Sequence, residues 1–208
     1  GCHTYVDYVI GRVLDAIAEH APDAIVRYTS DHGDFLASHH LAGKGPAMYD
    51  EITRIPFLVR WHGHAPKNSV CPHPVSHIDV VPTVLDALGL PVPKPLEGKS
   101  MLATFEDPKV RPNDAIFMEW GRYEIDHDGF GGFQPIRCVF DGRFKLTVNL
   151  LTTDELYDLQ NDPEEMTNLI DSAGHAPARN GLHDRLIEWM DRTRDPFRGY
   201  YWERRPWR

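Results

Sequence analysis

Two short β-rich runs, AIVRYTS (24–30) and IPFLVR (55–60), enclose a stretch that is rich in glycine, histidine and charge. Each run has a helical or irregular segment beside it. An amphipathic helix is predicted before the first run, because apolar residues recur there at helical spacing, namely Val6, Val9, Ile10, Val13, Leu14 and Ile17. Pro22 ends this helix, since proline cannot continue the hydrogen-bond ladder. The alternation of strands with helical segments predicts α/β layering, so we expect the α/β fold class.

A different pattern follows a stretch, 89–114, that is rich in proline and glycine. We interpret this stretch as an irregular crossing between two domains, 1–112 and 113–208. The second domain contains AIFMEW (115–120), which predicts a strand, and two β-rich runs around Asp141-Gly142, which predict a hairpin.

The chain ends with a further helical pattern. Residues 181–195 predict an amphipathic helix whose apolar face contains Leu182, Leu186, Ile187 and Met190. We therefore expect domain 113–208 to be a small antiparallel sheet that is closed by a C-terminal helix.

Other residues are assigned local roles. Asp79 is the predicted N-cap of a helix that Gly89 stops. The Asn161-Asp162-Pro163 sequence predicts a turn and then a helix start. Arg137 and Lys145, in the hairpin, are expected to be charges on the sheet surface.

Composition bounds the class of function. Among 208 residues, 41% are hydrophobic and 25% charged, which is typical of a globular protein. The net charge of −9 argues against nucleic acid as a partner. The three cysteines are far apart, so neither a disulfide framework nor a zinc knuckle is predicted. No apolar stretch approaches the ~20 residues of a membrane span, and none is predicted.

The basic, aromatic segment FRGYYWERRPWR (197–208) allows two interpretations. It could bind RNA or an acidic surface. We favour packing of its aromatic side chains on the body of the protein or on another subunit, which would suit a homo-oligomer.

Asp31, His32 and Lys44 are the candidate site residues. Asp31 and His32 follow the first β-rich run directly, and ligand sites of α/β sheets form beyond the carboxyl ends of strands. A carboxylate and an imidazole suit one divalent ion. Lys44, between Gly43 and Gly45, offers a compact positive charge for a sulfate or phosphate ester. The alternative is structural: Asp31 caps the next element and His32 lies on the surface.

The segment YTSDHGDFLASHHLAGKGPAMYDEITRIPFLVR (28–60) resembles the C-terminal signature of sulfatases and of related phosphonate monoester hydrolases in the alkaline-phosphatase superfamily. The resemblance continues in chain order over nearly the whole sequence. It includes the preceding helix YVDYVIGRVLDAI and the later segments VSHIDVVPTVLDALGL, LEGKSML, FDGRFKL and DELYDLQNDPEEMTNL. The implied fold is the C-terminal part of an alkaline-phosphatase-like α/β/α sandwich, followed by the small antiparallel sheet and terminal helix.

This resemblance implies a sulfatase that cleaves anionic sulfate esters. Asp31 and His32 match two metal ligands of the family, and Lys44 matches the lysine that contacts the transferred group. The implied metal is Ca²⁺, with Mn²⁺ or Zn²⁺ as alternatives. The implied nucleophile is a formylglycine, made from a Cys or Ser in a Cys/Ser-x-Pro-x-Arg motif. Hydrolysis of phosphonate or phosphate esters, or a non-catalytic degenerate relative, are the alternative functions.

The sequence departs from the family pattern in two respects. It contains no Cys/Ser-x-Pro-x-Arg motif and lacks the early Asp pair that completes the metal shell. It also begins inside a helical pattern without an initiator Met. We therefore expect these residues to be the C-terminal part of an enzyme whose N-terminal portion supplies the nucleophile and the other ligands, and we expect the 208 residues alone to be inactive.

Two further groups of residues border the predicted site. His39 and His40 lie between the predicted metal ligands and Lys44. His40 is a candidate on the leaving-group side, and the alternative is a solvated loop histidine. The stretch EWGRYEIDHDGFGGF (119–133) includes Glu119, Arg122, Tyr123, His127 and Asp128. This glycine-broken loop is interpreted either as a specificity loop or as a structural one.

Overall fold

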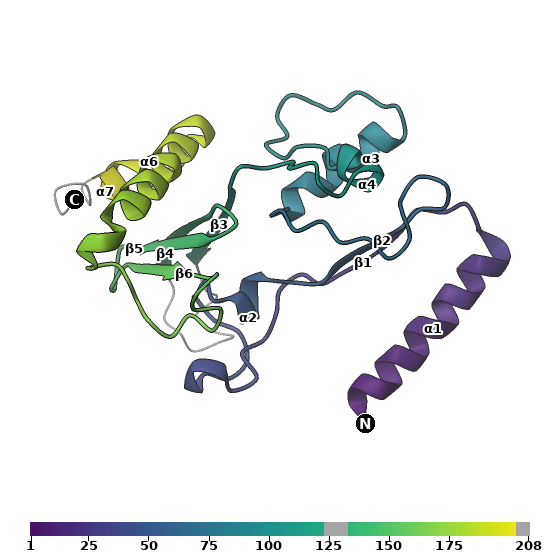
Figure 1. Cartoon of the computed structure of the whole chain (residues 1–208), viewed down its shortest axis with the longest axis horizontal. Helices are drawn as coiled ribbons and strands as arrows, with labels where there is room; N and C mark the ends of the chain where they lie inside the picture. The colour runs from purple at the N-terminus through teal and green to yellow at the C-terminus, as the bar shows by residue number, and fades with distance from the viewer. Residues whose placement is uncertain (123–132, 203–208) are drawn as a thin grey trace.

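The computed structural model describes residues 1–122 and 133–202 (Figure 1). Its first part consists of α1 (Cys2–His20), β1 (Val26–Thr29), η1 (Ser38–His40), α2 (Asp50–Thr53), β2 (Phe57–Arg60), η2 (His77–Asp79), α3 (Val80–Ala87) and α4 (Leu102–Glu106). Its second part consists of β3 (Ile116–Arg122), β4 (Phe133–Phe140), β5 (Phe144–Asn149), β6 (Glu155–Asp158), η3 (Ala173–His175), α6 (Ala176–Thr193) and α7 (Arg198–Trp202). The chain is therefore the expected mixture of helices and strands, with an antiparallel sheet and a long helix in its C-terminal part.

Helix α1 confirms the first predicted helix and ends where expected, because Ala21 N–H donates to the carbonyl of Ile17 just before Pro22. None of its side chains is buried, and Tyr5, Val6 and Tyr8 are exposed. Figure 1 shows α1 standing apart from the other helices. Among the described residues, no helix is both long and apolar enough to cross a membrane.

Strands β1 and β2 confirm the two β-rich runs that enclose the candidate site. They pair antiparallel, with Val26 opposite Arg60 and Thr29 opposite Phe57. Residues 30–56 therefore form an excursion that leaves β1 and returns to β2 beside it. This excursion carries all four candidate site residues.

The region around α3 corrects one prediction. Gly89, with φ +67°, ends α3 as expected, and the N–H of Leu90 donates to the carbonyl of Leu85. Asp79 occupies the predicted N-cap position of α3, but its side chain makes no capping hydrogen bond there and belongs to the preceding turn η2. Its buried carboxylate instead accepts hydrogen bonds from the backbone N–H groups of Ser76 and Lys99 and from the amide of Asn113. The stretch 89–114 is also less irregular than predicted, since it contains α4.

The predicted hairpin is confirmed. Strands β4 and β5 pair antiparallel up to Phe140 and Lys145, and Gly142 supplies a φ of +100° in the turn. The Asp141 carboxylate accepts hydrogen bonds from the N–H groups of Arg143 and Phe144, which fixes the turn. With β3 and β6 at its edges, this hairpin forms a sheet in the order β3-β4-β5-β6.

Helix α6 closes one face of the sheet, as Figure 1 shows. Its predicted apolar face is buried against Val139 of β4, Leu146 and Val148 of β5, and Leu156 of β6 through Leu182, Leu186, Ile187 and Met190. Tyr201 of α7 is also fully buried, with its hydroxyl 2.8 Å from the carbonyl oxygen of Pro135. The described end of the aromatic segment therefore packs on the body of the protein.

Three further predictions for this part are wrong. Arg137 and Lys145 are buried, and each side chain pairs with a carboxylate from a distant segment, Asp195 for Arg137 and Asp50 for Lys145. No helix starts at Pro163. The Asp162 carboxylate accepts hydrogen bonds from the N–H groups of Met166 and Thr167. Glu165 also has a φ of +52°, which a right-handed helix does not allow.

Candidate active-site loop

The turn after β1 fixes the direction of Asp31. The backbone N–H of His32 donates to Asp31 Oδ1 over 2.9 Å, and the hydroxyl of Ser30 lies 2.7 Å from the carbonyl oxygen of His32. The hydrogen bond from His32 N–H is the main cause that lowers the pKa of Asp31. The Asp31 side chain is 83% exposed. An ionised carboxylate therefore faces outward at the end of a strand.

The imidazole of His32 is oriented by its own neighbour. Nδ1 lies 2.7 Å from the carbonyl oxygen of Gly33, which can only accept a hydrogen bond, so we assign the proton to Nδ1. Nε2 then carries a lone pair. It lies 3.4 Å from Asp31 Oδ2, so the Asp31 and His32 side chains converge, as the sequence predicted.

Lys44 returns to the same point from the far end of the loop. Its Nζ lies 3.2 Å from Nε2 of His32. The return is fixed by a hydrogen bond of 2.8 Å from the N–H of Phe35 to the carbonyl of Gly43. The predicted proximity of Asp31, His32 and Lys44 is thus present, while their chemical roles stay predictions.

Gly33 ties this cluster to α2. Its N–H donates to the carbonyl of Ile52 over 2.9 Å. The two backbones approach so closely that a Cβ on residue 33 would overlap the carbonyl oxygen of Glu51. Only glycine allows this approach, and the approach fixes the position of Asp31 and His32 relative to α2.

His40 and His39 lie in a turn with an unusual backbone. Leu36, Ala37, His39 and His40 all have positive φ. His40 is exposed, and its proposed catalytic role stays a prediction. His39 instead stacks on the ring of Tyr49 at a centroid distance of 4.0 Å.

Sequence reasoning missed two contacts beside the cluster. Nε2 of His77 lies 2.9 Å from the carbonyl oxygen of Ser30, directly before Asp31. Nε2 of His39 lies 3.7 Å from Glu51 Oε2. Neither spacing has a local signal in the sequence, because both contacts depend on how distant segments pack.

The loop predicted after β3 lies mostly outside the described residues, including Tyr123, His127 and Asp128. Glu119 belongs to β3, where its carboxylate lies 3.5 Å from Nε of the buried Arg137. Glu119 is thus paired within the sheet.

The donor atoms fit part of a metal shell. An ionised carboxylate and an imidazole Nε2, with Nδ1 held by a carbonyl, are the donor set expected of two metal ligands. The described residues contain no group of three or more His, Cys, Asp or Glu side chains arranged for a metal. Asp31 and His32 can therefore supply two ligands, and a complete shell needs others.

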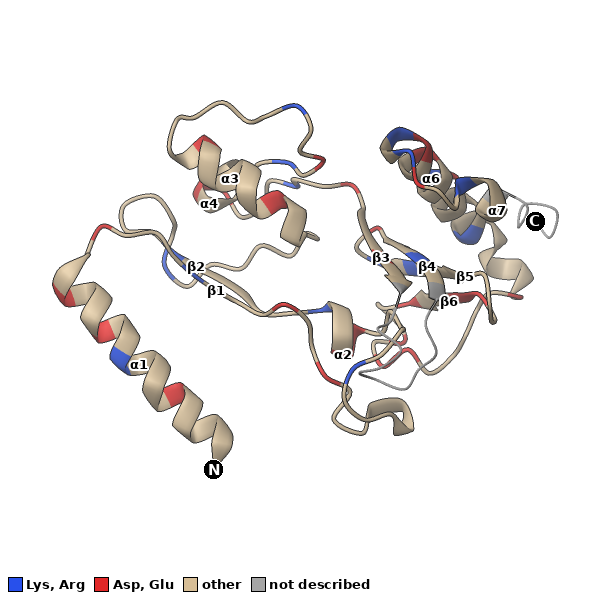
Figure 2. Cartoon of the chain, turned by 180° about the vertical axis from the view of Figure 1, so that it is seen from behind, with Lys and Arg blue, Asp and Glu red and all other residues tan. Residues whose placement is uncertain are grey.

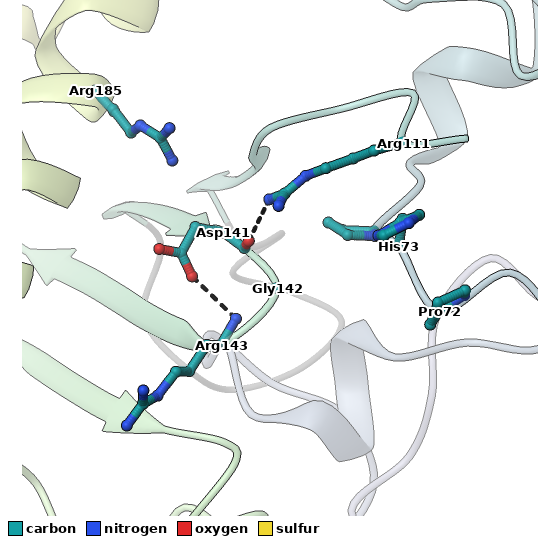
Figure 3. Close-up of a pocket in the computed structure, with 8 residues that line it drawn as sticks. Pro72, His73, Arg111, Asp141, Gly142, Arg143 and Arg185 are labelled. Atoms are coloured by element: carbon teal, nitrogen blue, oxygen red, sulfur yellow. Dashed lines mark hydrogen bonds between the residues drawn. The ribbon is translucent and has the colours of Figure 1, made fainter. Parts of the chain in front are cut away.

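A separate hollow of about 370 Å³ lies where the hairpin turn meets residues 72–74, Arg111 and α6 (Figure 3). Three arginines line it, but each is engaged within the protein. Arg111 donates to the carbonyls of Asp114 and Asp141, Arg143 pairs with Asp158, and Arg185 donates to Asp114. Figure 2 shows that basic and acidic residues are also interspersed along α6, which borders this hollow, and along α1. We assign no ligand to this hollow.

The fold and the comparisons with known proteins place the chain as the C-terminal portion of a protein of the sulfatase class in the alkaline-phosphatase superfamily. Residues 40–192 match the family model described as "N-sulphoglucosamine sulphohydrolase, C-terminal", and the chain belongs to this family.

The relatives agree with this assignment. The chain is 46% identical, over all of its 208 residues, to an uncharacterized sulfatase of Escherichia coli K12, of which it covers 40%. It resembles the crystal structure of a putative sulfatase from Bacteroides fragilis with a TM-score of 0.81 and 25% identity, covering 96% of this chain and 43% of that one. It also resembles a phosphonate monoester hydrolase from Silicibacter pomeroyi with a TM-score of 0.75 and 26% identity, covering 90% and 39%. The chain thus spans about two fifths of the length of these relatives.

Proposed function

We propose that this chain is the C-terminal part of an enzyme that hydrolyses sulfate esters. The observation that carries the proposal is the convergence of Asp31, His32 and Lys44. The imidazole Nε2 of His32 lies 3.4 Å from the Asp31 carboxylate and 3.2 Å from the Lys44 ammonium. Such a cluster can bind a divalent ion and an anionic group side by side. The sulfatase relatives supply the reaction class.

Each residue has a definite task in this proposal. Asp31 and His32 would hold the metal, for which we favour Ca²⁺, with Mn²⁺ or Zn²⁺ as alternatives. When bound, the metal supplies Lewis-acid stabilisation of charge on the ester. Lys44 would donate hydrogen bonds to the non-bridging oxygens of the sulfate group, and His40 would lie on the leaving-group side. We expect the nucleophile, a formylglycine, in the N-terminal portion that the relatives possess.

Hydrolysis of phosphonate or phosphate esters is the second candidate. The similarity to a phosphonate monoester hydrolase favours it, and the lysine and the metal ligands would serve either anion. A third possibility is a degenerate relative that binds without catalysis.

One comparison tests these candidates. The full-length protein that carries these residues is assayed with an aryl sulfate, a phosphonate monoester and a phosphate monoester that share one leaving group. The proposal expects the highest kcat/KM for the sulfate. A preference for the phosphonate would support the second candidate, and no turnover of any ester by metal-loaded protein would support the third.

Residues 1–208 alone serve as the companion sample. We expect no turnover of the aryl sulfate and no tightly bound metal, because two ligands from one loop leave most of a Ca²⁺ shell unfilled. Turnover by this piece would reveal a nucleophile within the chain and would contradict the proposal.

A further inference from the structure

A buried ion cluster joins α2 to the C-terminal sheet. Lys145 of β5 has a side chain that is only 2% exposed. Its ammonium lies 2.5 Å from Asp50 Oδ1, 2.8 Å from Glu165 Oε1 and 3.0 Å from the carbonyl oxygen of Met48. Burial lowers the pKa of Lys145, but the nearby charges of Glu165 and Asp50 raise it by more than burial lowers it. The pKa of Lys145 is therefore above its ordinary value. Lys145 therefore stays charged and is held from three directions.

Glu165 completes the cluster from the segment after β6. Its side chain is 1% exposed, and its Oε2 accepts a hydrogen bond from the backbone N–H of Asp50 over 2.6 Å. The backbone of Glu165 is left-handed, with a φ of +52°.

The two residues before Asp50 are anchored on the same sheet. Met48 is buried against Ile136 and Cys138 of β4. The hydroxyl of Tyr49 donates to Glu155 of β6 over 3.0 Å. Three consecutive residues thus attach the start of α2 to β4, β5 and β6.

The same short segment holds the candidate active-site loop. The carbonyl of Ile52 accepts the N–H of Gly33, next to His32. Phe35, whose backbone N–H bonds to the carbonyl of Gly43 next to Lys44, packs its ring edge-on against Tyr49 at a centroid distance of 6.3 Å. A continuous set of contacts therefore runs from Lys145 and Glu165, through α2, to the loop.

Stability alone is a weak reason for this cluster. A buried ion group can often be replaced by apolar residues without loss of stability, because desolvation offsets much of the charge attraction. The charged hydrogen bonds add a fixed orientation, since each one sets the angle as well as the distance at which Asp50 is held. A catalytic site benefits from such an anchor, because its rate depends on the exact placement of its side chains.

We propose that Lys145 and Glu165 are positioning residues, which set the place of the loop carrying Asp31, His32 and Lys44 by anchoring Asp50 and α2 on the C-terminal sheet. The effect of this anchor on catalysis rests on the proposed function. The physical connection between the C-terminal sheet and the loop does not depend on that function.

The test uses Lys145→Met and Glu165→Gln in the full-length protein. Lys145→Met removes the cation, and Glu165→Gln keeps the size of the side chain and an acceptor for Asp50, so it is the variant to use if Lys145→Met fails to fold. Lys145→Arg is the conservative variant. Arg143→Met is the matched control, because it breaks an ion pair of the same sheet, with Asp158, that does not reach α2.

Two readouts separate positioning from general stability. The first is hydrogen exchange of peptides within residues 31–45, compared with peptides from β5. We expect exchange in 31–45 to be at least ~10-fold faster in Lys145→Met and Glu165→Gln but not in Arg143→Met. The second is aryl-sulfate turnover, where we expect kcat to fall roughly 10- to 100-fold with little change in KM, and Lys145→Arg to recover part of it.

The outcomes are distinguishable from failure of the proposed function. Folded Lys145→Met and Glu165→Gln proteins with the exchange rates and kcat of Arg143→Met would overturn the inference. Full activity of Asp31→Ala and Lys44→Ala would instead overturn the proposed function, and faster exchange in 31–45 would then still support the anchor.

Discussion

The ammonium of Lys44 lies 3.2 Å from Nε2 of His32, twelve positions earlier in the chain. Because Nδ1 of His32 is held by the carbonyl of Gly33, Nε2 is the nitrogen that faces positive charge. The loop therefore brings one lone pair, one carboxylate and one ammonium close together. This arrangement is suited to a metal ion and an anion bound next to each other. The contribution of each residue to metal binding and to turnover can be measured by replacing it singly.

Replacing Lys44 by alanine should lower kcat/KM for an aryl sulfate by roughly 10²- to 10³-fold, because charge on the transferred group loses a nearby donor. Lys94→Ala is the matched control, since it removes the same charge from an exposed position. Steady-state kinetics of both full-length variants gives the comparison. Equal kcat/KM for Lys44→Ala and Lys94→Ala would remove Lys44 from the site.

Replacing Asp31 by alanine should abolish turnover and lower the metal content of the full-length protein, because a charged ligand is lost. Asp34→Ala serves as the control, since Asp34 lies in the same loop but accepts a hydrogen bond from the N–H of Leu36. Elemental analysis after dialysis measures the metal. If Asp31→Ala binds as much metal as Asp34→Ala and remains active, the ligand assignment is wrong.

Replacing Gly33 by alanine should destabilise the protein by about 1–3 kcal/mol, since the new Cβ would overlap the carbonyl oxygen of Glu51 and force the backbones apart. The contrasting change is Gly181→Ala, in an exposed position of α6 with no neighbouring atom within 4 Å. That change should stabilise by up to ~1 kcal/mol through helix propensity. Urea unfolding of the two variants should therefore shift in opposite directions, and a shift of Gly33→Ala toward higher urea would contradict the close approach.

Local signals account for the elements that the sequence predicted well. The apolar spacing of α1 and α6, the β-rich runs and the Asp141-Gly142 turn each act within a few residues, so they can be read without knowing the fold. The position of Asp31 directly after β1 followed in the same way. The proximity of Lys44 was expected from family resemblance rather than from its spacing.

Long-range pairing accounts for the errors. Lys145 and Arg137 were assigned to the sheet surface because strand position alone does not show whether a charged side chain has a partner. Their partners, Asp50 and Asp195, are 95 and 58 positions away. The helix expected at Pro163 failed for a related reason: Glu165 adopts a left-handed conformation while its side chain reaches Lys145 and Asp50. Burial of charge, and with it the anchor of the loop, is a property of the assembled chain.

The Arg143–Asp158 ion pair should make stability depend on pH in acid. Hydrogen bonds from Arg143 are the main cause that lowers the pKa of Asp158 to about 2, below its ordinary value of 3.8. Because the folded-state pKa is the lower one, this stabilisation is fully present above the ordinary pKa and is lost as the pH falls from about 4 toward about 2. Arg143→Met should raise the pKa of Asp158 and so flatten the loss of stability over that range. Melting temperatures measured from pH 5 to pH 2 test this, and parallel curves for the two proteins would show that Arg143 does not set the pKa.

Cys138 should be inert toward thiol reagents as long as the sheet is folded. Burial raises the pKa of its thiol to about 12, although Lys145 lowers it somewhat, and the thiolate is the reactive form. Relative to an ordinary thiol with a pKa of about 8.5, the thiolate fraction at pH 8 is smaller by roughly 10³-fold, and the packing of Met48 against this buried side chain also blocks access. Iodoacetamide at pH 8, followed by peptide mass spectrometry, should therefore leave Cys138 unmodified in native protein and modify it fully in guanidinium. Cys2, which is exposed in this structure, provides the internal comparison in the 208-residue chain. Modification of native Cys138 at the rate of Cys2 would mean that the sheet opens readily at β4, beneath the residues that anchor α2.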